Sequence, residues 1–431
     1  MNIAASLSLA LLQFPAARGD EPPLGWWFLF TIIKILAVFT VIMVGVAMLT
    51  LAERKISAWI QDRLGPNRVG PGGLLQPAAD GLKNIMKEET YPEAAYKPLF
   101  ILAPMLSFIP ALITFAVIPF AAPWDSPKGL VPMVIADAPI GFLYILAIAS
   151  LGVYGIVLAG WASNNKYSLL GGLRSSAQMV SYEVAMGLAA VAVLLIAGNV
   201  SLSAIVSQQQ AMGWNVITVL LGFFIFLVAA FAETNRLPFD LPEAESELIA
   251  GYHTEYSAMK FSMFFIAEYS NMVTASGLMV TLFFGGWDSP FTQWDNVLPH
   301  TGWKTILTLI VFLAKVVFFL FLYMWIRWTL PRFRYDQLMS LGWKVLLPLG
   351  LGYIVVMAAA LLGLDAAGIA RGSAAYLAIL GVLNIVLAIL VFVILDRGRI
   401  VSPAYSRISS QELRRLRAMS VQSALAPSEG D

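Results

Sequence analysis

The stretch "AETNRLPFDLPEAESELIAGYHTEYS", residues 232–257, carries a dense group of carboxylates between two hydrophobic segments that are each long enough to cross a bilayer. Its only basic residue besides a histidine is Arg236. Glu243 and Glu247 are four residues apart, which places them on one face if this part is helical. Crowded carboxylates repel one another and share protons, so the stretch suits proton chemistry. Its acidic residues are Glu233, Asp240, Glu243, Glu245, Glu247 and Glu255.

Two further carboxylates, Glu183 and Glu268, lie inside hydrophobic segments. Glu268 is near the middle of its segment, so its side chain must face protein or water. A proton-carrying role is the first interpretation, with a neutral structural glutamate as the alternative. Glu183 is close to the end of its segment, where a solvated helix end is the alternative. Lys315 is as deep as Glu268 and could match it, whereas Lys34 lies nearer an end and is expected to snorkel.

The elements that must position these acids are membrane helices. Of 431 residues, 59% are hydrophobic and only 12% are charged, about half the charged fraction of a soluble domain. Long apolar runs recur along the chain, which predicts an all-α, polytopic transmembrane helical bundle. Nine spans are expected, at 27–51, 97–121, 135–161, 178–198, 213–232, 259–284, 305–328, 342–363 and 374–395.

Lys and Arg are distributed unevenly between the two sides of this bundle. They concentrate in the segments 52–96, 162–177, 233–258 and 329–341 and in the C-terminal tail. The other side carries only Arg18, Lys128, Lys304 and Arg371. The positive-inside rule therefore predicts a multi-pass protein of the cytoplasmic (cell) membrane, with the N-terminus outside and the C-terminus in the cytoplasm. The acidic stretch is then cytoplasmic, with a charge opposite to that of the other cytoplasmic segments. A plain solvated loop is the alternative to a funnel for protons.

The first cytoplasmic segment combines a rigid turn with an amphipathic helix. "GPNRVGPGG" is too rich in Gly and Pro to be helical. After Pro77, apolar residues recur every three or four positions while Asp80 and Lys83 take the other face. Such a helix lies at the membrane interface. It is either a plain surface helix or a wall of a site shared with a peripheral partner, and periodicity leaves both open.

Composition excludes several kinds of function. Cysteine is absent, which excludes disulfides, thiolate-bound iron–sulfur clusters and Cys-based zinc sites. The only histidines are His253 and His300, and no metal site is expected. A formal net charge of +1 gives no nucleic-acid footprint. The spans show no matched pair of Gly/Pro-broken helices, the pattern of an inverted-repeat transporter.

Four stretches together resemble the H-subunit family of bacterial respiratory NADH–quinone oxidoreductase, known in mitochondria as NADH dehydrogenase subunit 1. The resemblance covers roughly residues 25–363. The stretches are "AERKISAWIQDRLGPNRVGPGGLLQPAADGLK", "GWASNNKYSLLGGLRSSAQMVSYE", "AETNRLPFDLPEAESELIAGYHTEYS" and "FFIAEYSNM".

The resemblance implies a subunit that forms much of a quinone tunnel and couples quinone reduction to proton translocation. It implies partners, namely peripheral-arm subunits that carry FMN and iron–sulfur clusters and neighbouring membrane-arm subunits. This chain itself would bind no cofactor or metal, and the quinone, ubiquinone or menaquinone, would be the substrate. The implied quinone-tunnel residues are Arg54, Arg63, Asp80, Phe261, Phe264 and Phe265, with a core or lipid-facing role as the alternative for each phenylalanine. The implied proton relay is Glu183, Glu233, Glu243, Glu245, Glu247, Glu255 and Glu268.

The domain plan follows from the same comparison. Residues 1–24 are expected to be a short extracytoplasmic segment, 25–363 an eight-span core, 364–398 an extra transmembrane helix and 399–431 a basic cytoplasmic tail. Two other functions stay open at this point. One is the equivalent membrane component of an energy-converting hydrogenase-type complex. The other, from a different class, is a stand-alone ion-coupled transporter.

Overall fold

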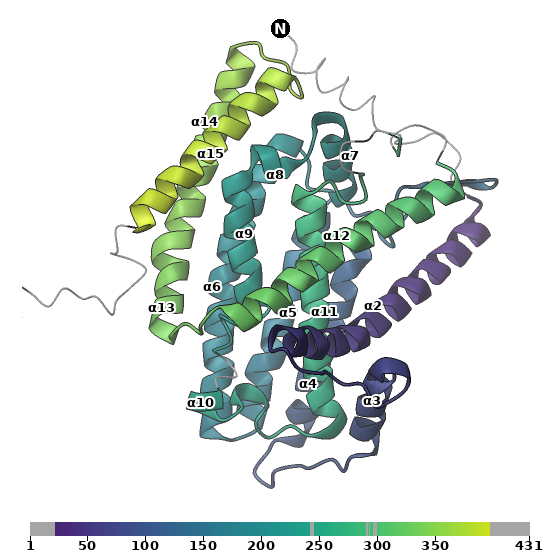
Figure 1. The fold of residues 1–431 in the computed structure, drawn as a ribbon, viewed down its shortest axis with the longest axis vertical. Coiled ribbons are helices and arrows are strands. Elements are labelled where there is room, and N and C mark those ends of the chain that lie inside the picture. Colours follow the sequence, from purple (N-terminus) through teal and green to yellow (C-terminus); the bar gives the residue numbers. More distant parts are fainter. Residues whose placement is uncertain (1–21, 242–244, 290–291, 293, 296–299, 397–431) are drawn as a thin grey trace, which may run out of the picture. The chain divides into compact units, whose positions relative to one another are not determined.

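The computed structural model describes residues 22–241, 245–289, 292, 294–295 and 300–396 (Figure 1). Glu243, most of the N-terminal segment and the basic tail lie outside the described residues, and for Glu245 only the backbone is described. The chain divides into one unit of residues 1–384 and another of residues 385–431. The expected domain boundaries at 24, 363 and 398 stay a prediction.

Helices dominate the described residues, which confirms the all-α class. A short antiparallel hairpin, β1 (Trp124–Ser126) with β2 (Gly129–Val131), pairs Trp124 with Val131. The longer helices are α2 (Leu24–Ile60), α4 (Lys97–Ile113), α5 (Gly141–Ala162), α6 (Lys166–Ala197), α9 (Leu220–Glu233), α11 (Ala258–Phe283), α12 (Gly302–Thr329), α14 (Leu347–Ala366) and α15 (Ala374–Asp396). The shorter ones are α3 (Gln76–Met86), α7 (Leu202–Met212), α8 (Asn215–Thr218), α10 (Glu245–Leu248) and α13 (Tyr335–Ser340), with 3-10 turns at Pro71–Gly73, Thr114–Val117 and Gly251–His253 and a π turn at Leu341–Leu346.

Seven helical segments among the described residues are long and apolar enough to cross a membrane, which makes the chain a multi-pass membrane protein. The other two expected spans, 213–232 and 259–284, also coincide with helices. The first is broken at Val219 (φ −132°, ψ 40°), so that α9 has only 14 residues. The second, α11, has 26 residues but carries Lys260 and Glu268. The number nine therefore stays a prediction.

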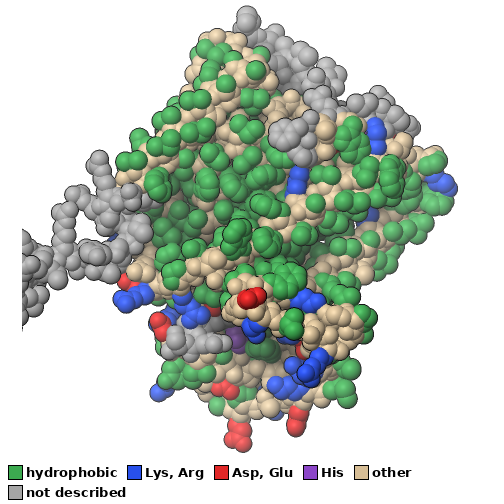
Figure 2. All heavy atoms as spheres, viewed as in Figure 1, with side chains coloured by type: hydrophobic (Ala, Val, Ile, Leu, Met, Phe, Trp, Pro, Cys, Tyr) green, Lys and Arg blue, Asp and Glu red, His purple; other side chains and the backbone are tan. Residues whose placement is uncertain are grey.

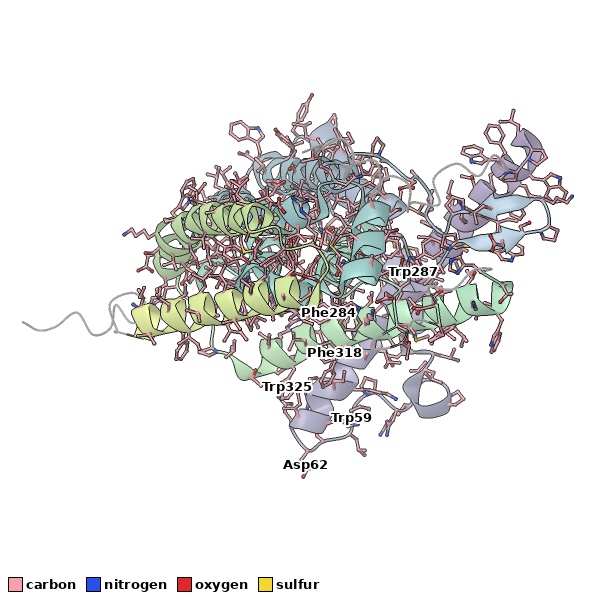
Figure 3. The ribbon with its side chains drawn as sticks, turned by 90° about the horizontal axis from the view of Figure 1, so that it is seen from above. Trp59, Asp62, Phe284, Trp287, Phe318 and Trp325 are labelled. Carbon is pink, nitrogen blue, oxygen red and sulfur yellow. The ribbon has the colours of Figure 1, made fainter. Side chains whose placement is uncertain are left out.

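The charged side chains seen in Figure 2 gather mainly at the end of the molecule that carries α3 and α10, while hydrophobic side chains cover the middle of that face. Helix α3 confirms the predicted amphipathic helix, and its residues Leu82, Ile85 and Met86 are exposed. It contacts both α2 and α11. Beside it, Trp59 and Asp62 lie at the end of α2 (Figure 3). Asp62 has a positive φ of 51°, a conformation that ends a helix.

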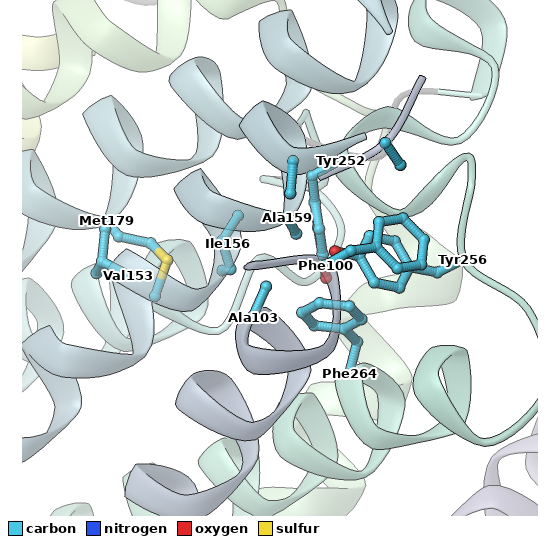
Figure 4. Close-up of a cluster of buried hydrophobic side chains, with 11 residues drawn as sticks. Phe100, Ala103, Val153, Ile156, Ala159, Met179, Tyr252, Tyr256 and Phe264 are labelled. Atoms are coloured by element: carbon cyan, nitrogen blue, oxygen red, sulfur yellow. The ribbon is translucent and has the colours of Figure 1, made fainter. Parts of the chain in front are cut away.

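A buried cluster ties α4, α5, α6 and α11 to the loop that precedes α11 (Figure 4). At its centre the rings of Phe100 and Tyr256 stack with centroids 4.0 Å apart, and Phe264 meets Tyr256 edge-on at 5.0 Å. Gly171 of α6 lets the loop approach closely, because a Cβ there would lie 2.6 Å from the backbone nitrogen of Tyr252. The loop that bears the acidic stretch is thus packed onto the bundle.

Asn384 joins α15 to the broken span. This side chain is fully buried, donates to the Thr218 carbonyl at 2.5 Å and accepts from the Tyr353 hydroxyl at 2.6 Å. The break at Val219 interrupts the helix directly after Thr218. Away from water, an unpaired carbonyl is costly, so Asn384 satisfies a polar group at the break.

We expect Asn384→Leu to lower the free energy of unfolding by about 1–3 kcal/mol, because two buried polar groups lose their partner. Thermal unfolding of the purified protein in detergent measures the change. Val382→Ala, on the same helix but at a residue that is 61% exposed, is the matched control and should unfold like the wild type. Equal loss in both variants would contradict the role given to Asn384.

Candidate functional site

The acidic stretch begins in a loop that α6 holds in place through Gln178. The buried side chain of Gln178 donates to the carbonyls of Ala232 at 2.7 Å and Phe239 at 2.8 Å, and to the Asn235 side chain at 3.1 Å. These bonds fold residues 232–239 back on themselves. As a result, Arg236 points into the protein, and its side chain is only 5% exposed.

Arg236 lies between two glutamates from different helices. Its Nε is 2.6 Å from Oε1 of Glu268 on α11, and its Nη1 is 3.4 Å from Oε1 of Glu53 on α2. Its guanidinium also lies 4.2 Å above the ring of Tyr269. Burial disfavours the charged guanidinium, but Glu268 and Glu53 outweigh this and raise the pKa of Arg236, so it stays ionised.

Glu53 is the second junction of this network. The Tyr269 hydroxyl donates to its Oε2 at 2.5 Å, and Arg327 of α12 forms an ion pair with its Oε1. Two arginines and two glutamates therefore balance in charge within a poorly hydrated interior. Such groups are expensive to bury, and removing one partner typically costs about 3–5 kcal/mol. The network joins α2, α11, α12 and the loop after α9.

A small polar cavity adjoins the network. Its volume is about 30 Å³, room for about two water molecules. Two carboxylates, those of Glu233 and Glu268, line it. The remaining lining residues are Ser107, Gly152, Ile156, Met179, Thr234, Asn235, Tyr252, Phe264, Ala267 and Asn271. Polar partners suit water there, and water next to carboxylates allows protons to move.

The predicted relay residues fall into an inner and an outer set. Glu183 is half-buried, accepts from Ser150 at 2.5 Å and is close enough to Glu233 for the two carboxylates to repel. Glu183, Glu233 and Glu268 thus form the inner set. In the outer set, Glu247 has a side chain 51% exposed and pairs with Arg174 at 2.8 Å. Glu255 accepts from Asn165 at 2.6 Å.

The two intramembrane lysines bind backbone carbonyls. Lys315 donates to the carbonyls of Phe284, Gly286 and Asp288, just beyond α11, at 2.7, 3.0 and 2.5 Å. Its ammonium therefore serves the end of α11, and no bond to Glu268 is found in the described structure. The prediction that Lys34 snorkels is wrong in detail: Lys34 donates to the carbonyls of residues 132 and 134, because the segment after β2 comes within its reach.

Most of the predicted quinone residues gather around α2 and α3. Arg54 pairs with Asp80 at 2.6 Å and thereby connects the end of α2 to α3. Arg54 and Arg63 both line a cavity of about 310 Å³ between the end of α2 and the turn that follows. Arg63 donates from Nε to Gln61 at 2.6 Å. This cavity is large enough for a planar ring, and its charge is positive.

The three phenylalanines divide between a core and a partly open position. Phe264 is 3% exposed and belongs to the buried cluster, as the core alternative expected. Phe261 and Phe265 are partly exposed, and their ring centroids are 4.6 Å apart. Both rings face His253, at 5.2 and 5.9 Å. Of the three, only this pair could present an aromatic surface to a ligand.

Sequence reasoning misses Glu53, Tyr269 and Arg327 as members of the site. Glu53 groups with Arg54 and Lys55 as interfacial anchoring, although it is an acid at the membrane end of a basic segment. Tyr269 directly follows Glu268, and Arg327 is the next-to-last residue of a predicted span. These positions carry a signal, but only the fold shows that three distant segments meet.

Burial lowers the pKa of His253 to about 4, from about 6.5 in an unfolded chain. Below pH 6.5 the unfolded chain takes up a proton that the folded protein does not. The free energy of unfolding therefore falls as the pH drops from 6.5 toward 4. We expect wild type to lose about 1.4 kcal/mol more than His253→Phe between pH 7.5 and 5.5. Unfolding in detergent at both pH values tests this, and parallel losses would contradict it.

Comparisons with known proteins agree on one family. A family model described as NADH dehydrogenase matches residues 33–358. An NADH-quinone oxidoreductase membrane chain of Cytophaga hutchinsonii is 51% identical over 330 residues, which cover 77% of this chain and 96% of that protein. Its namesake in Leptospira biflexa is 52% identical, with 76% and 93% covered. NADH-quinone oxidoreductase subunit 8 of Rhodothermus marinus is 53% identical, with 78% and 97% covered. Helix α15 lies beyond the family match.

Proposed function

The chain belongs to the NADH dehydrogenase family, and from this we propose that it is a membrane subunit of a proton-translocating NADH:quinone oxidoreductase. In this role it forms part of the quinone site and passes charge from that site into the membrane. It carries no redox centre of its own. Electrons come from NADH through FMN and iron–sulfur clusters in peripheral-arm subunits, and neighbouring membrane-arm subunits complete the assembly. Residues 25–363 form the working core, with the N-terminus outside and the C-terminus in the cytoplasm.

One observation carries this proposal: the successive residues Glu53 and Arg54 stand on two different sites. Arg54 lines the basic cavity and pairs with Asp80. Glu53 belongs to the buried network with Arg236. A change of charge in the cavity is therefore felt one residue away in the network. At an effective dielectric constant of about 20, two charges 4 Å apart interact by about 4 kcal/mol, which is enough to move a proton.

The geometry supports the following sequence. Reduction of a quinone to a quinol consumes two electrons and two protons, and so leaves a local demand for positive charge. Arg236 is shared between Glu53 and Glu268, so a stronger pull from Glu53 weakens its hold on Glu268. Glu268 then takes up a proton from water in the small cavity. Glu233 lines the same cavity, and Glu183 lies next in line. The exposed Glu247 and Glu255 serve as the entry from the surface, and Glu243 and Glu245 complete the acidic stretch.

The assembly itself is tested by purification from native membranes in mild detergent. We expect the chain to co-migrate with flavin- and iron–sulfur-containing subunits and with NADH oxidation activity. A peripheral subunit is needed to supply electrons, because this chain has no cysteine for a cluster. An active polypeptide that migrates alone would instead support a stand-alone ion-coupled transporter and would overturn the proposal.

The relay is tested by Glu268→Gln in the assembled complex. We expect NADH-to-quinone turnover to fall about tenfold or more, since positioned proton-transfer groups contribute on the order of 10²–10⁴. NADH-to-ferricyanide activity, which bypasses the quinone, should stay unchanged. Glu247→Gln is the matched control at the surface and should have a smaller effect, because a 51% exposed carboxylate can be replaced by water. Full quinone turnover and pumping in Glu268→Gln would remove the relay.

A further inference from the structure

Lys260, in the first turn of α11, is held in a cage of aromatic and acidic groups. Its side chain is only 9% exposed, and its Nζ is 2.7 Å from Oε2 of Glu89. The same ammonium lies 3.5 Å from the ring centroid of Tyr91 and 5.8 Å from that of Phe100. Tyr91 in turn donates its hydroxyl to Glu89 at 2.9 Å. The hydrogen bonds from Lys260 and Tyr91 lower the pKa of Glu89, so the carboxylate stays ionised at neutral pH.

A second contact lies beside the cage. The backbone nitrogen of Thr90 donates to the hydroxyl of Ser257 at 3.1 Å, and the two hydroxyl oxygens are 2.8 Å apart. Ser257 directly precedes α11. Segment 89–91 is therefore attached to the beginning of α11 through three successive residues. We call this set of contacts, made by Glu89, Thr90, Tyr91, Ser257 and Lys260, the latch.

The latch connects two walls of the candidate quinone site. Segment 89–91 follows α3 after only two residues, and α3 carries Asp80, the partner of Arg54. Helix α11 carries Phe261 and Phe265, directly beyond Lys260. No residue of α3 is itself buried, so this helix has little packing of its own to fix its position. The contacts at its C-terminal side therefore decide how closely it stays beside α11.

We propose that Lys260 is a positioning residue for the quinone site: through Glu89 and Tyr91 it latches the end of α3 onto α11 and so sets the spacing between Arg54–Asp80 and the Phe261–Phe265 pair. The inference rests on the proposed function and assigns a role to residues outside the quinone contacts and the acidic relay. A cation that is buried against an aromatic face and also ion-paired holds two segments together better than an exposed ion pair does. Lys260 itself needs no contact with the quinone.

Lys260→Met tests the latch in the intact complex. Methionine fills the cage without a charge, and Glu89, which is 42% exposed, is left in water. We expect the KM for a short-chain quinone to rise about three- to tenfold with little change in kcat, as for the loss of one cation–π and ion-pair contact. NADH-to-ferricyanide activity should be unchanged. Lys260→Arg keeps the charge and the aromatic contact and should restore the KM to within about twofold.

A covalent replacement for the latch separates positioning from a general loss of structure. The chain has no cysteine, and the hydroxyls of Thr90 and Ser257 are close enough for a disulfide between substituted side chains. In the Lys260→Met background, Thr90→Cys with Ser257→Cys should return the KM to near wild type when oxidised and lose this rescue when reduced. Each single cysteine variant is the control. A high KM in the oxidised double variant, with the disulfide verified, would overturn the latch.

Arg54→Ala separates failure of the latch from failure of the proposed function. If the quinone site is real, this variant weakens the binding of a quinone-site inhibitor. Weakened binding in Arg54→Ala together with an unchanged KM in Lys260→Met would overturn the latch alone. Unchanged inhibitor binding in Arg54→Ala and unchanged KM in Lys260→Met would remove the quinone site from this region, and the latch with it.

Discussion

Arg236 is shared by two glutamates that come from helices far apart in the sequence, and the rest of the site depends on this sharing. Glu53 and Glu268 would repel each other in a poorly hydrated interior, and the guanidinium between them makes their approach possible. The interaction also requires the loop after α9 to fold inward, which Gln178 brings about through three hydrogen bonds. One cation thus fixes the position of α2, α11 and the acidic loop together.

The same sharing gives the network a directional character. Arg236 holds Glu268 at 2.6 Å but Glu53 at 3.4 Å, and Arg327 and Tyr269 supply the rest of the charge balance at Glu53. A group with one tight and one loose partner responds to a change on the loose side by redistributing its bonds. Glu53 is the side that neighbours Arg54, so the loose contact faces the basic cavity.

Local pattern is sufficient to predict the helical class, the amphipathic α3 and the acids of the inner set. Hydrophobic length identifies a span, and a carboxylate inside a span is conspicuous by its cost. Other features depend on tertiary contacts that no local pattern contains. Glu53 reads as one more interfacial charge, because its partners lie more than 180 residues away. Glu247 looks equivalent to Glu233 by letter, yet the fold leaves one at the surface and sets the other against a cavity. The break at Val219 also escapes prediction, since a run of apolar residues continues through it.

The shortness of α9 has a consequence for the electrical work of moving charge. Its 14 residues extend about 21 Å at 1.5 Å per residue, whereas the hydrocarbon layer is about 30 Å thick. A bilayer that meets this helix must thin, or its polar ends must lie deeper than lipid headgroups. A proton at Glu233, the last residue of α9, is then separated from the opposite aqueous phase by a thinner insulating layer than lipid alone presents. It experiences only part of the roughly 2.3 kcal/mol that each 100 mV of membrane potential imposes on a full crossing.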